Sequence, residues 1–337
     1  MQGLGSIVLV LAFCCPFLSY AVPVEAQTMQ LCGAIVGTVV LTTNAELTCD
    51  VQCVNAPETP CIQFGADHIW LRLNGFKITG PADPPTNCVP ADPNLFVPED
   101  GIRTNGHDFV QILGPGLVQR FRRHGIEVID STKATVRHVT SHHNCFSGLI
   151  LTRTNDSDIE ENTSVRNAIG SGASPTSFPC GGTCINSSHD NRFRRNEYAG
   201  NGSIATGGTP RGPLPNDFGI GLVGNSSGNV IEENGVGGNV NGVWVGPLTK
   251  NNLIRRNVIA GNPPVQVSPS IATPVGVDIR DLTPAGATIF EENLCITYEG
   301  TAAPSPCAFY NGLLDPLYIF PKFSGHRNTS LGSSKSQ

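Results

Sequence analysis

The sequence is poor in charged residues, and this shortage excludes several kinds of protein. Asp, Glu, Lys and Arg make up 14% of the 337 residues, against about a quarter in an average soluble domain. The formal net charge is −6, and the chain has no Lys/Arg cluster, so it lacks the basic surface that binds nucleic acid. Methionine occurs only at Met1 and Met29, which leaves few soft ligands for copper. We therefore expect no nucleic-acid partner.

Helical patterns and long apolar runs are also scarce. After the N-terminal segment, no stretch approaches the ~18 apolar residues that a membrane-spanning helix needs. Glycine and proline instead occupy 38 and 26 positions, and Asn, Thr, Ser and Val are abundant. This composition favours many short strands joined by turns. We expect an all-β protein with no membrane association once the N-terminal segment is removed.

The N-terminal segment "MQGLGSIVLVLAFCCPFLSYAVPVEAQT" is an apolar run followed by small residues. It is typical of a secretory signal peptide, with cleavage after Ala26 or Ala21. No Lys or Arg precedes the apolar core, so a retained membrane anchor stays open as the alternative. We expect residues 1–26 to be a signal peptide and the protein to be secreted or periplasmic.

Cysteine usage agrees with export. Of twelve cysteines, Cys14 and Cys15 lie in the expected signal peptide, and the other ten are Cys32, Cys49, Cys53, Cys61, Cys88, Cys145, Cys180, Cys184, Cys295 and Cys307. An even number in an exported chain favours disulfides. Their connectivity cannot be deduced. A zinc site is the alternative, although the spacings fit no familiar zinc motif.

A repeat of about 23 residues runs through the chain. "NVIEENGVGGN" (229–239) and "NLIRRNVIAGN" (252–262) carry asparagine in the same phase. A glycine followed by an apolar residue recurs at Gly101, Gly125, Gly148, Gly219, Gly242 and Gly276, with Cys184 in its place once. The steps between these starts are 24, 23, 36, 35, 23 and 34 residues. The unit is too short for a domain and too regular for chance.

Within a unit, apolar residues alternate, as in "GIEV" and "GVWV". This is the period of a strand, and the L-x-x-L-x-L signature of leucine-rich repeats is absent. Three short strands per unit, each paired in parallel with its copy in the next unit, fit the pattern. Because each coil then advances about 4.8 Å, equivalent side chains stack. We expect an internal ladder at one corner, in which each amide bonds to its copies, formed by Asn162, Asn196, Asn234, Asn257 and Asn293.

These motifs, "GI-x-V" followed by "I-x-x-N" and a closing Asn, resemble those of the right-handed parallel β-helix repeat proteins with the pectin-lyase-like fold. The resemblance covers residues 61 to about 300. It implies a single right-handed parallel β-helix, a solenoid of three-strand coils with caps at both ends. We expect an N-terminal cap at 27–60, the β-helix at 61–300, a C-terminal cap at 301–328 and a disordered tail at 329–337.

The outward side chains of the first strand of each coil should stack into two columns. One column is Arg103, Glu127, Ile150, Asn186, Gly221, Trp244 and Asp278, and the other is Asn105, Ile129, Thr152, Ser188, Val223, Gly246 and Arg280. Extra residues at 168–182, 202–217 and 263–275 should project as loops beside this face and form a groove. We expect ligand contacts there from Trp244, Asn186, Ser188, Asp278 and Arg280. Trp244 would serve as a platform for a sugar ring, unless the loop 263–275 covers it.

Two candidate carboxylates lie in the turns after the first strands of adjacent coils. Asp156 and Asp190 should come within about 5 Å of each other, with Arg153 and His189 close by in sequence. Such a spacing suits glycoside hydrolysis, and these four residues are the predicted catalytic set. Short polar residues in turns are more often caps than acids or bases.

The resemblance also implies lyase or epimerase chemistry on uronic acids, for which related pectate lyases use clustered acids to bind Ca²⁺. Asp278, Arg280 and Asp281 contain suitable residue types, but the calcium cluster, the Asp-Pro-His motif of alginate epimerases and the Asp-Asp pair of polygalacturonases have no clear counterpart. We expect no cofactor, with Ca²⁺ required only in a uronate lyase. His138, His142 and His143 raise the alternative of a periplasmic metal-handling protein, and a solvent-facing turn explains them as well.

The sequence thus predicts a monomeric protein that binds a polysaccharide or cell-surface glycan in a groove on the first-strand sheet. It leaves open whether the protein also cleaves or epimerises that glycan as a lyase, hydrolase or epimerase, or is a noncatalytic binding or surface-structural β-helix.

Overall fold

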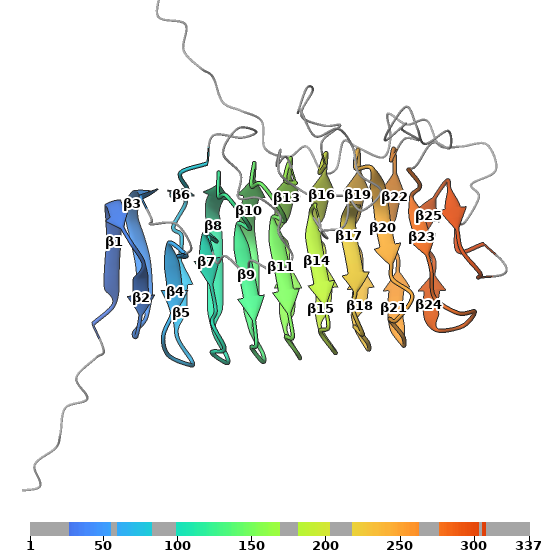
Figure 1. Cartoon of the computed structure of the whole chain (residues 1–337), viewed down its shortest axis with the longest axis horizontal. Helices are drawn as coiled ribbons and strands as arrows, with labels where there is room; N and C mark the ends of the chain where they lie inside the picture. Colours follow the sequence, from blue (N-terminus) through green and yellow to red (C-terminus); the bar gives the residue numbers. More distant parts are fainter. Residues whose placement is uncertain are drawn as a thin grey trace, which may run out of the picture.

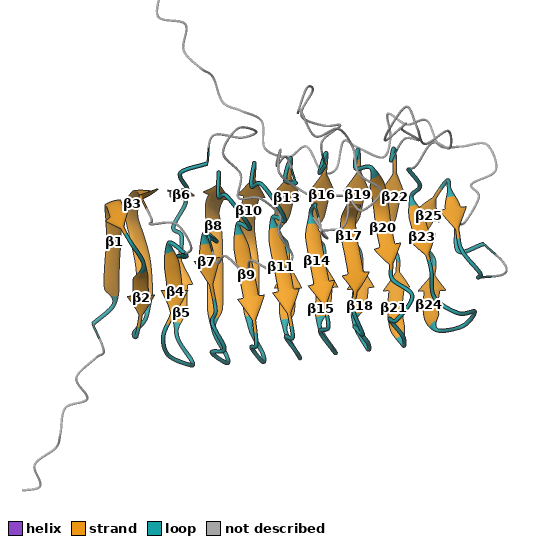
Figure 2. Cartoon of the chain, viewed as in Figure 1, coloured by secondary structure: helices purple, strands orange, loops and turns teal. Residues whose placement is uncertain are grey.

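The computed structural model describes residues 27–54, 59–82, 99–168, 181–202, 218–262, 276–302 and 305–307. These residues form strands and no helix (Figure 2). The strands are stacked in a row of coils from β1 at one end to β25 at the other (Figure 1). Among the same residues, no helix is long and apolar enough to cross a membrane. The expected all-β parallel coil is confirmed.

The first strand of each coil contributes to a sheet of ten parallel strands, called here the first-strand sheet. Its members are β2 (Val39–Leu41), β4 (Ile62–Phe64), β7 (Ile102–Arg103), β9 (Ile126–Ile129), β11 (Leu149–Thr152), β14 (Thr183–Asn186), β17 (Phe218–Val223), β20 (Asn241–Val245), β23 (Ile279–Asp281) and β26 (Tyr298–Glu299). Each strand pairs in parallel with the one before and after it.

The second and third strands of the coils share one 16-stranded sheet that is folded along its middle. The second strands are β5 (Trp70–Arg72), β12 (Asp158–Glu160), β15 (Arg192–Arg194), β18 (Val230–Glu232), β21 (Asn252–Arg255) and β24 (Thr288–Glu291). The third strands are β6 (Lys77–Thr79), β13 (Thr163–Val165), β16 (Glu197–Ala199), β19 (Gly235–Gly237), β22 (Val258–Ala260) and β25 (Leu294–Cys295). Four long strands run through both halves, namely β1 (Met29–Val36), β3 (Ala45–Val54), β8 (Gln111–Gln119) and β10 (Thr135–His142).

The coils begin earlier than the sequence suggested. β1 pairs in parallel with β3, and β2 pairs with β4 of the first-strand sheet. Residues 29–54, expected as part of a separate cap, therefore already belong to the stack. The expected signal peptide, most of the expected C-terminal cap and the tail lie outside the described residues.

The glycine that starts most coils allows close approach of the next coil. A Cβ on Gly125, Gly148 or Gly182 would come within 2.8, 3.1 or 2.3 Å of the carbonyl oxygen one coil further along. The same holds for Gly219 and Gly242, where the distances are 3.0 and 2.4 Å. Only glycine fits these positions. Gly182, rather than Cys184, is thus the start of its coil.

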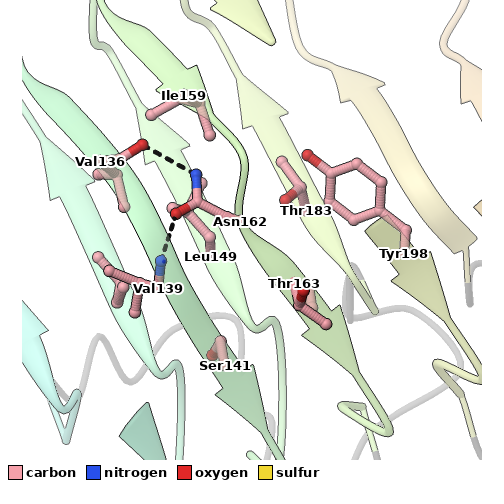
Figure 3. A pocket seen from close by; sticks show the side chains of 11 residues that line it. Val136, Val139, Ser141, Leu149, Ile159, Asn162, Thr163, Thr183 and Tyr198 are labelled. Atoms are coloured by element: carbon pink, nitrogen blue, oxygen red, sulfur yellow. Dashed lines mark hydrogen bonds between the residues drawn. The ribbon is translucent and has the colours of Figure 1, made fainter. Parts of the chain in front are cut away.

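The predicted asparagine ladder stands at the corner between the second and third strands. Asn162 Nδ2 donates to Asn196 Oδ1 over 3.1 Å, and the same bond links Asn196 to Asn234, Asn234 to Asn257 and Asn257 to Asn293 over 3.0, 3.0 and 2.9 Å. Asn162 also accepts from the Val139 backbone N–H and donates to the Val136 carbonyl (Figure 3). The ladder thus pairs the buried backbone groups that the bend removes from the sheet.

The left-handed conformation at this corner belongs to the residue before each ladder asparagine. Its φ lies between 51° and 58° at Glu161, Arg195, Glu233, Arg256 and Glu292, and His138, which precedes Val139 at the same corner, has a φ of 57°. The ladder asparagines themselves do not adopt it. The asparagine instead provides the hydrogen bonds that hold the bend.

Two further ladders occupy the other corners. Asn144, Asn167, Asn201, Asn239 and Asn262 form one of them, and Asn191, Asn229 and Asn252 form the other. Stacked amides therefore lie at all three corners of the coil. Aliphatic and aromatic side chains fill the space between the corners.

Disulfides support both ends of the stack. Cys32 pairs with Cys49, Cys53 with Cys61, and Cys295 with Cys307. Cys145 and Cys184 are also disulfide-bonded. Among the described residues, no group of His, Cys, Asp and Glu could hold a metal ion, so the zinc alternative finds no support there.

Candidate functional site

The outer face of the first-strand sheet carries one continuous column of side chains. The strand register places Arg103, Glu127, Ile150, Cys184, Gly221, Trp244, Arg280 and Glu299 one above another. The column predicted from the sequence was right at five of its seven positions and was displaced by two residues at the other two. Asn186 and Asp278 were assigned to it because Cys184 and Gly276 were aligned with the coil-starting glycines.

One end of the column is a buried cluster of charges. Arg103 Nη1 lies 2.6 Å from Glu127 Oε2 and 3.3 Å from Asp100 Oδ2. Arg123 Nη1 lies 3.6 and 3.7 Å from the same two oxygens. Both carboxylates are fully buried. Asp100, directly before the coil-starting Gly101, and Arg123 were missed in the sequence, although Arg103 and Glu127 had been placed in the column.

The pKa values of the two carboxyls in this cluster are shifted in opposite directions. Burial raises the pKa of Glu127 well above its usual value, and the neighbouring charge of Asp100 adds to the effect. Burial also acts to raise the pKa of Asp100, but the charges of Arg123 and Arg103 lower it overall. The two pKa values are therefore shifted apart, with Glu127 the weaker acid of the pair.

The buried cluster pairs an acid with a base, but no ligand can reach the carboxyls from solvent. His124 beside it has a pKa of about 3, because burial and the charge of Arg123 disfavour its protonated form. Asp100 and Glu127 thus lie between the guanidiniums of Arg103 and Arg123 in one buried network, with a neutral His124 beside it. We assign this cluster to the stability of the fold.

Trp244 lies toward the other end of the column, on β20, and is partly exposed. Its ring packs on Phe218 with ring centroids 5.7 Å apart, and the Phe218 ring covers Gly221, where a Cβ would come within 1.8 Å of it. Ile150, Cys184 and Val223 complete this apolar patch. The indole therefore stands on a rigid apolar base rather than on a flexible loop.

A charged pair borders Trp244. The Arg280 guanidinium lies 5.7 Å from the centroid of the indole ring, within the range of a cation–π interaction. Arg280 also donates two hydrogen bonds of 2.6 and 3.0 Å to Glu299 Oε2. The Glu299 side chain is 54% exposed. An aromatic face, a guanidinium and a solvent-facing carboxylate thus meet in one place.

The remaining predicted ligand contacts lie elsewhere. Ser188 is fully buried, and its hydroxyl donates to the Asn186 carbonyl. Asp278 is 2% exposed and accepts hydrogen bonds from Asn262 and from the backbone of Ile296 and Thr297. Neither can touch a ligand on the outer face, so both assignments are corrected. Asn186 is partly exposed at the end of β14, beside Val223 rather than Gly221.

The predicted catalytic residues lie at the corner after the first strands. Asp156 and Asp190 are exposed and occupy adjacent coils, because Asn155 pairs with His189 and the Asp156 N–H donates to the His189 carbonyl. His189 Nδ1 contacts Ser227 Oγ at 2.8 Å. Arg153 binds Asp130 through two hydrogen bonds of 2.6 and 2.8 Å. The structure thus brings the two aspartates one coil apart and gives Arg153 a different carboxylate.

Other candidate sites are weaker. His138 Nε2 lies 3.0 Å from Glu161, whereas His142 and His143 contact each other at the third-strand corner. Burial lowers the pKa of His142 to about 4. A small cavity inside the coil is lined by core residues that include Thr183 and Tyr198 (Figure 3). It lies in the core, so it offers no entrance for a glycan.

Comparisons with known proteins support this architecture. The family model for the right-handed β-helix region matches residues 116–281. No curated protein matches the sequence at a significant level. The Dettilon tailspike protein gp208 shares 16% identity with a TM-score of 0.53, over 80% of this chain and 55% of the tailspike.

Two further solved structures are similar in the same way. Tailspike protein 2 of Escherichia coli O157:H7 bacteriophage CAB120 shares 12% identity with a TM-score of 0.50, over 82% of this chain and 37% of the tailspike. The A-module of the Azotobacter vinelandii mannuronan C-5 epimerase AlgE6 shares 14% identity with a TM-score of 0.47, over 82% of this chain and 70% of the module. This chain therefore spans about half, or less, of the two tailspikes, and the likeness to the tailspikes supports the fold alone.

Proposed function

We propose that this right-handed parallel β-helix protein binds polysaccharide on the outer face of its first-strand sheet, with Trp244 as the platform for a sugar ring. The observation that carries the proposal is the partly exposed indole of Trp244 on the rigid base of Phe218 and Gly221. Carbohydrate rings present apolar C–H faces and polar edges. The Trp244 ring can stack on the C–H face of a sugar, and Arg280 and Glu299 beside it can hydrogen-bond to the hydroxyls at its edge.

The flat sheet suits an extended polymer better than a small molecule. Coils repeat at about 4.8 Å, so the face offers the same backbone geometry over many sugar units. Arg280 donates and Glu299 accepts hydrogen bonds, which favours hydroxyl-rich ligands over purely anionic ones. The polymer would run along the coil axis, across Trp244.

Export is part of the proposal. Cys32–Cys49, Cys53–Cys61 and Cys295–Cys307 are all oxidised, and structural disulfides persist in secreted and periplasmic compartments. A surface or periplasmic location would expose the protein to cell-surface glycans. We propose that it acts there as a monomer.

The test is a comparison of two tryptophan variants. Trp70 is also partly buried, and the Arg72 guanidinium lies 4.2 Å from the centroid of its ring, but it stands on β5 outside the first-strand sheet. We expect Trp244→Ala to weaken binding to an immobilised glycan panel at least tenfold and Trp70→Ala to leave it unchanged. Equal binding by wild type and Trp244→Ala would refute the assignment, as would binding of no glycan by the wild type.

Catalysis at Asp156 and Asp190 is the second candidate function. Their backbones lie one coil apart, about 4.8 Å, and from there the two side chains would have to reach the ~5–5.5 Å carboxyl spacing of retaining glycosidases. One aspartate, ionised, would attack the anomeric carbon while the other, as a carboxylic acid, protonates the leaving oxygen. The second aspartate, now ionised, would then take a proton from the water that hydrolyses the glycosyl ester and restores the first carboxylate. His189, whose ring contacts Ser227, would position the reacting groups, and Arg153 would act only if it left Asp130.

A product assay separates the two functions. Reducing ends report hydrolysis, and ultraviolet absorbance of the unsaturated product reports lyase action. A hydrolase predicts new reducing ends that Asp156→Ala and Asp190→Ala each abolish. Activity that persists in both variants would remove the catalytic assignment, and binding without any product would leave the noncatalytic function standing. A lyase would show a Ca²⁺ requirement on addition of a chelator.

A further inference from the structure

Charged pairs alternate in sign from coil to coil in front of the asparagine ladder. The residues before successive ladder asparagines are Glu160-Glu161, Arg194-Arg195, Glu232-Glu233, Arg255-Arg256 and Glu291-Glu292. Arg137-His138 holds the same place in the coil before them. The tripeptides therefore read EEN, RRN, EEN, RRN and EEN along the chain.

The strand register stacks these residues directly. Arg137 pairs with Glu160, Glu160 with Arg194, Arg194 with Glu232, Glu232 with Arg255, and Arg255 with Glu291. We call this column, with the corner residue that follows each member, the charge ladder. It runs along the outer edge of the second strands, on β10, β12, β15, β18, β21 and β24.

Each buried glutamate of the ladder contacts arginines from the coils on both sides. Glu160 is bound by Arg137 from one coil and by Arg194 and Arg195 from the next. Glu232 accepts from Arg192 on one side and from Arg255 and Arg256 on the other, with distances of 2.8, 2.7 and 3.2 Å. Both glutamates are almost fully buried beneath these guanidiniums. The contacts thus link neighbouring coils and do not close within one coil.

The corner residues repeat the alternation. His138 contacts Glu161 at 3.0 Å, Arg195 contacts Glu161 at 2.7 Å, and Arg256 contacts Glu233 at 3.2 Å. All of them adopt the left-handed conformation. Two parallel columns therefore carry the same sign pattern.

Most other contacts between coils do not distinguish one coil from another. At the inward position of the second strand, Ile231 and Ile254 follow Phe193 in successive coils. Every ladder asparagine makes the same hydrogen bonds. A chain that skipped the coil 218–240 would put Ile254 in the place of Ile231 and would keep its asparagine ladder. Such a skip would place Glu against Glu or Arg against Arg about one strand spacing apart.

We propose that the alternation of acidic and basic pairs in the charge ladder determines which coil stacks on which. The charges act against a skip of the coil 218–240, which the matching isoleucines Ile231 and Ile254 would otherwise tolerate. This role is separate from the glycan face, which lies on the first-strand sheet. Failure of one proposal leaves the other intact.

The test uses two variants of the same four positions. In the swap variant, Glu232→Arg, Glu233→Arg, Arg255→Glu and Arg256→Glu keep the composition but bring Arg194 against arginine and Glu291 against glutamate. In the neutral variant, all four become Gln. Each is refolded from denaturant with its disulfides intact, and the product is digested briefly with protease.

The swap variant should favour one misfolded form, in which the coil 218–240 is skipped. With the coil 218–240 skipped, the introduced acid at 255 would lie against Arg194. We expect at least a fivefold lower refolding yield at low salt and new cleavage within 218–240, with partial recovery at high salt because exposed charges are screened. The neutral variant should lose far less yield and gain no such cleavage.

Two results would overturn the proposal. One is wild-type yield and cleavage in the swap variant, and the other is the same loss in both variants, since ordinary ion pairing would then explain it. If neither variant folds, Glu233→Arg and Glu233→Gln replace them, because the Glu233 side chain is 39% exposed and tolerates change. The arginine variant should refold less well than the glutamine variant, and equal yields would refute the proposal.

Discussion

Asn234 and Asn257 lie one coil apart, and the side-chain amide of Asn234 donates to Asn257 Oδ1 over 3.0 Å. The Asn234 backbone N–H donates to the same oxygen over 2.9 Å. This pair shows that equivalent residues of successive coils meet, which is the condition for every column described above. The outer face, the charge ladder and the core all depend on it.

Loss of one ladder amide should destabilise the protein clearly. Asn234 accepts from the backbone and side chain of Asn196 and donates to the Phe193 carbonyl. Asn234→Ala leaves these buried groups unpaired, so we expect a loss of about 2–4 kcal/mol in the free energy of unfolding. Urea denaturation measures it, and the exposed Asn225→Ala is the matched control, with a change below about 0.5 kcal/mol. Equal stability of the two variants would contradict the ladder.

The buried pair Asp100 and Glu127 should make stability depend on pH. The pKa of Glu127 is raised in the folded state above the ordinary 4.5, so this carboxyl favours folding at low pH and costs stability as pH rises from 4.5 toward its folded pKa. Glu127→Gln cannot ionise and avoids that cost. We expect the stability of the variant relative to wild type to increase between pH 4 and pH 8.

Asp100 provides the opposite control. Its pKa is lowered, so it contributes stability above the ordinary value of 3.8, and that contribution is lost as pH falls through its folded pKa. Asp100→Asn should cost roughly 3 kcal/mol near neutral pH, because Arg103 and Arg123 lose the charge that balances them. A Glu127→Gln difference that shrinks with rising pH would contradict the raised pKa of Glu127.

Gly221→Ala should disturb the base beneath Trp244. The new Cβ would come within 1.8 Å of the Phe218 ring, and that ring must move. We expect a loss of about 1–3 kcal/mol, typical of an overpacked site, and a shift in tryptophan emission as Trp244 loses its support. Unchanged emission and stability would show that Phe218 does not hold the indole.

Acid should weaken the charge ladder at Glu232. Burial acts to raise the pKa of this carboxyl, but its hydrogen bonds with Arg192 and Arg255 lower it overall to about 2. Its contribution to stability is therefore complete above pH 4.5 and is lost as pH falls toward 2. Glu232→Gln should be less stable than wild type at pH 7, and the difference should shrink at pH 2–3 in thermal unfolding. A constant difference would indicate a packing effect.

The repeat predicted the fold because it has a physical cause in every coil. Glycine allows the backbones of successive coils to approach, alternating apolar residues fill the core, and asparagine holds the corner. Each of these residue types therefore recurs in the sequence at the period of the coil. The second and third asparagine ladders were visible in the same phase, at Asn229 and Asn239, but only one corner was assigned. The alternating EEN and RRN tripeptides were equally visible.

The site was harder to predict because it depends on register and burial. Thr183 and Cys184 follow their glycine directly, and a two-residue misalignment there moved Asn186 into the wrong column. Alternation also indicates which side chains point outward, but it does not indicate which of them are covered. Glu127 and Ser188 therefore looked available in the sequence and are buried in the structure.

The most direct test of the glycan-binding face is the fluorescence of a single tryptophan. The chain has two tryptophans, so Trp70→Phe leaves Trp244 as the only indole, and a glycan that binds the wild type is titrated into it. We predict a saturable change in Trp244 emission with the same Kd that an independent binding measurement gives. Binding with no change in Trp244 emission would place the glycan elsewhere and contradict the account.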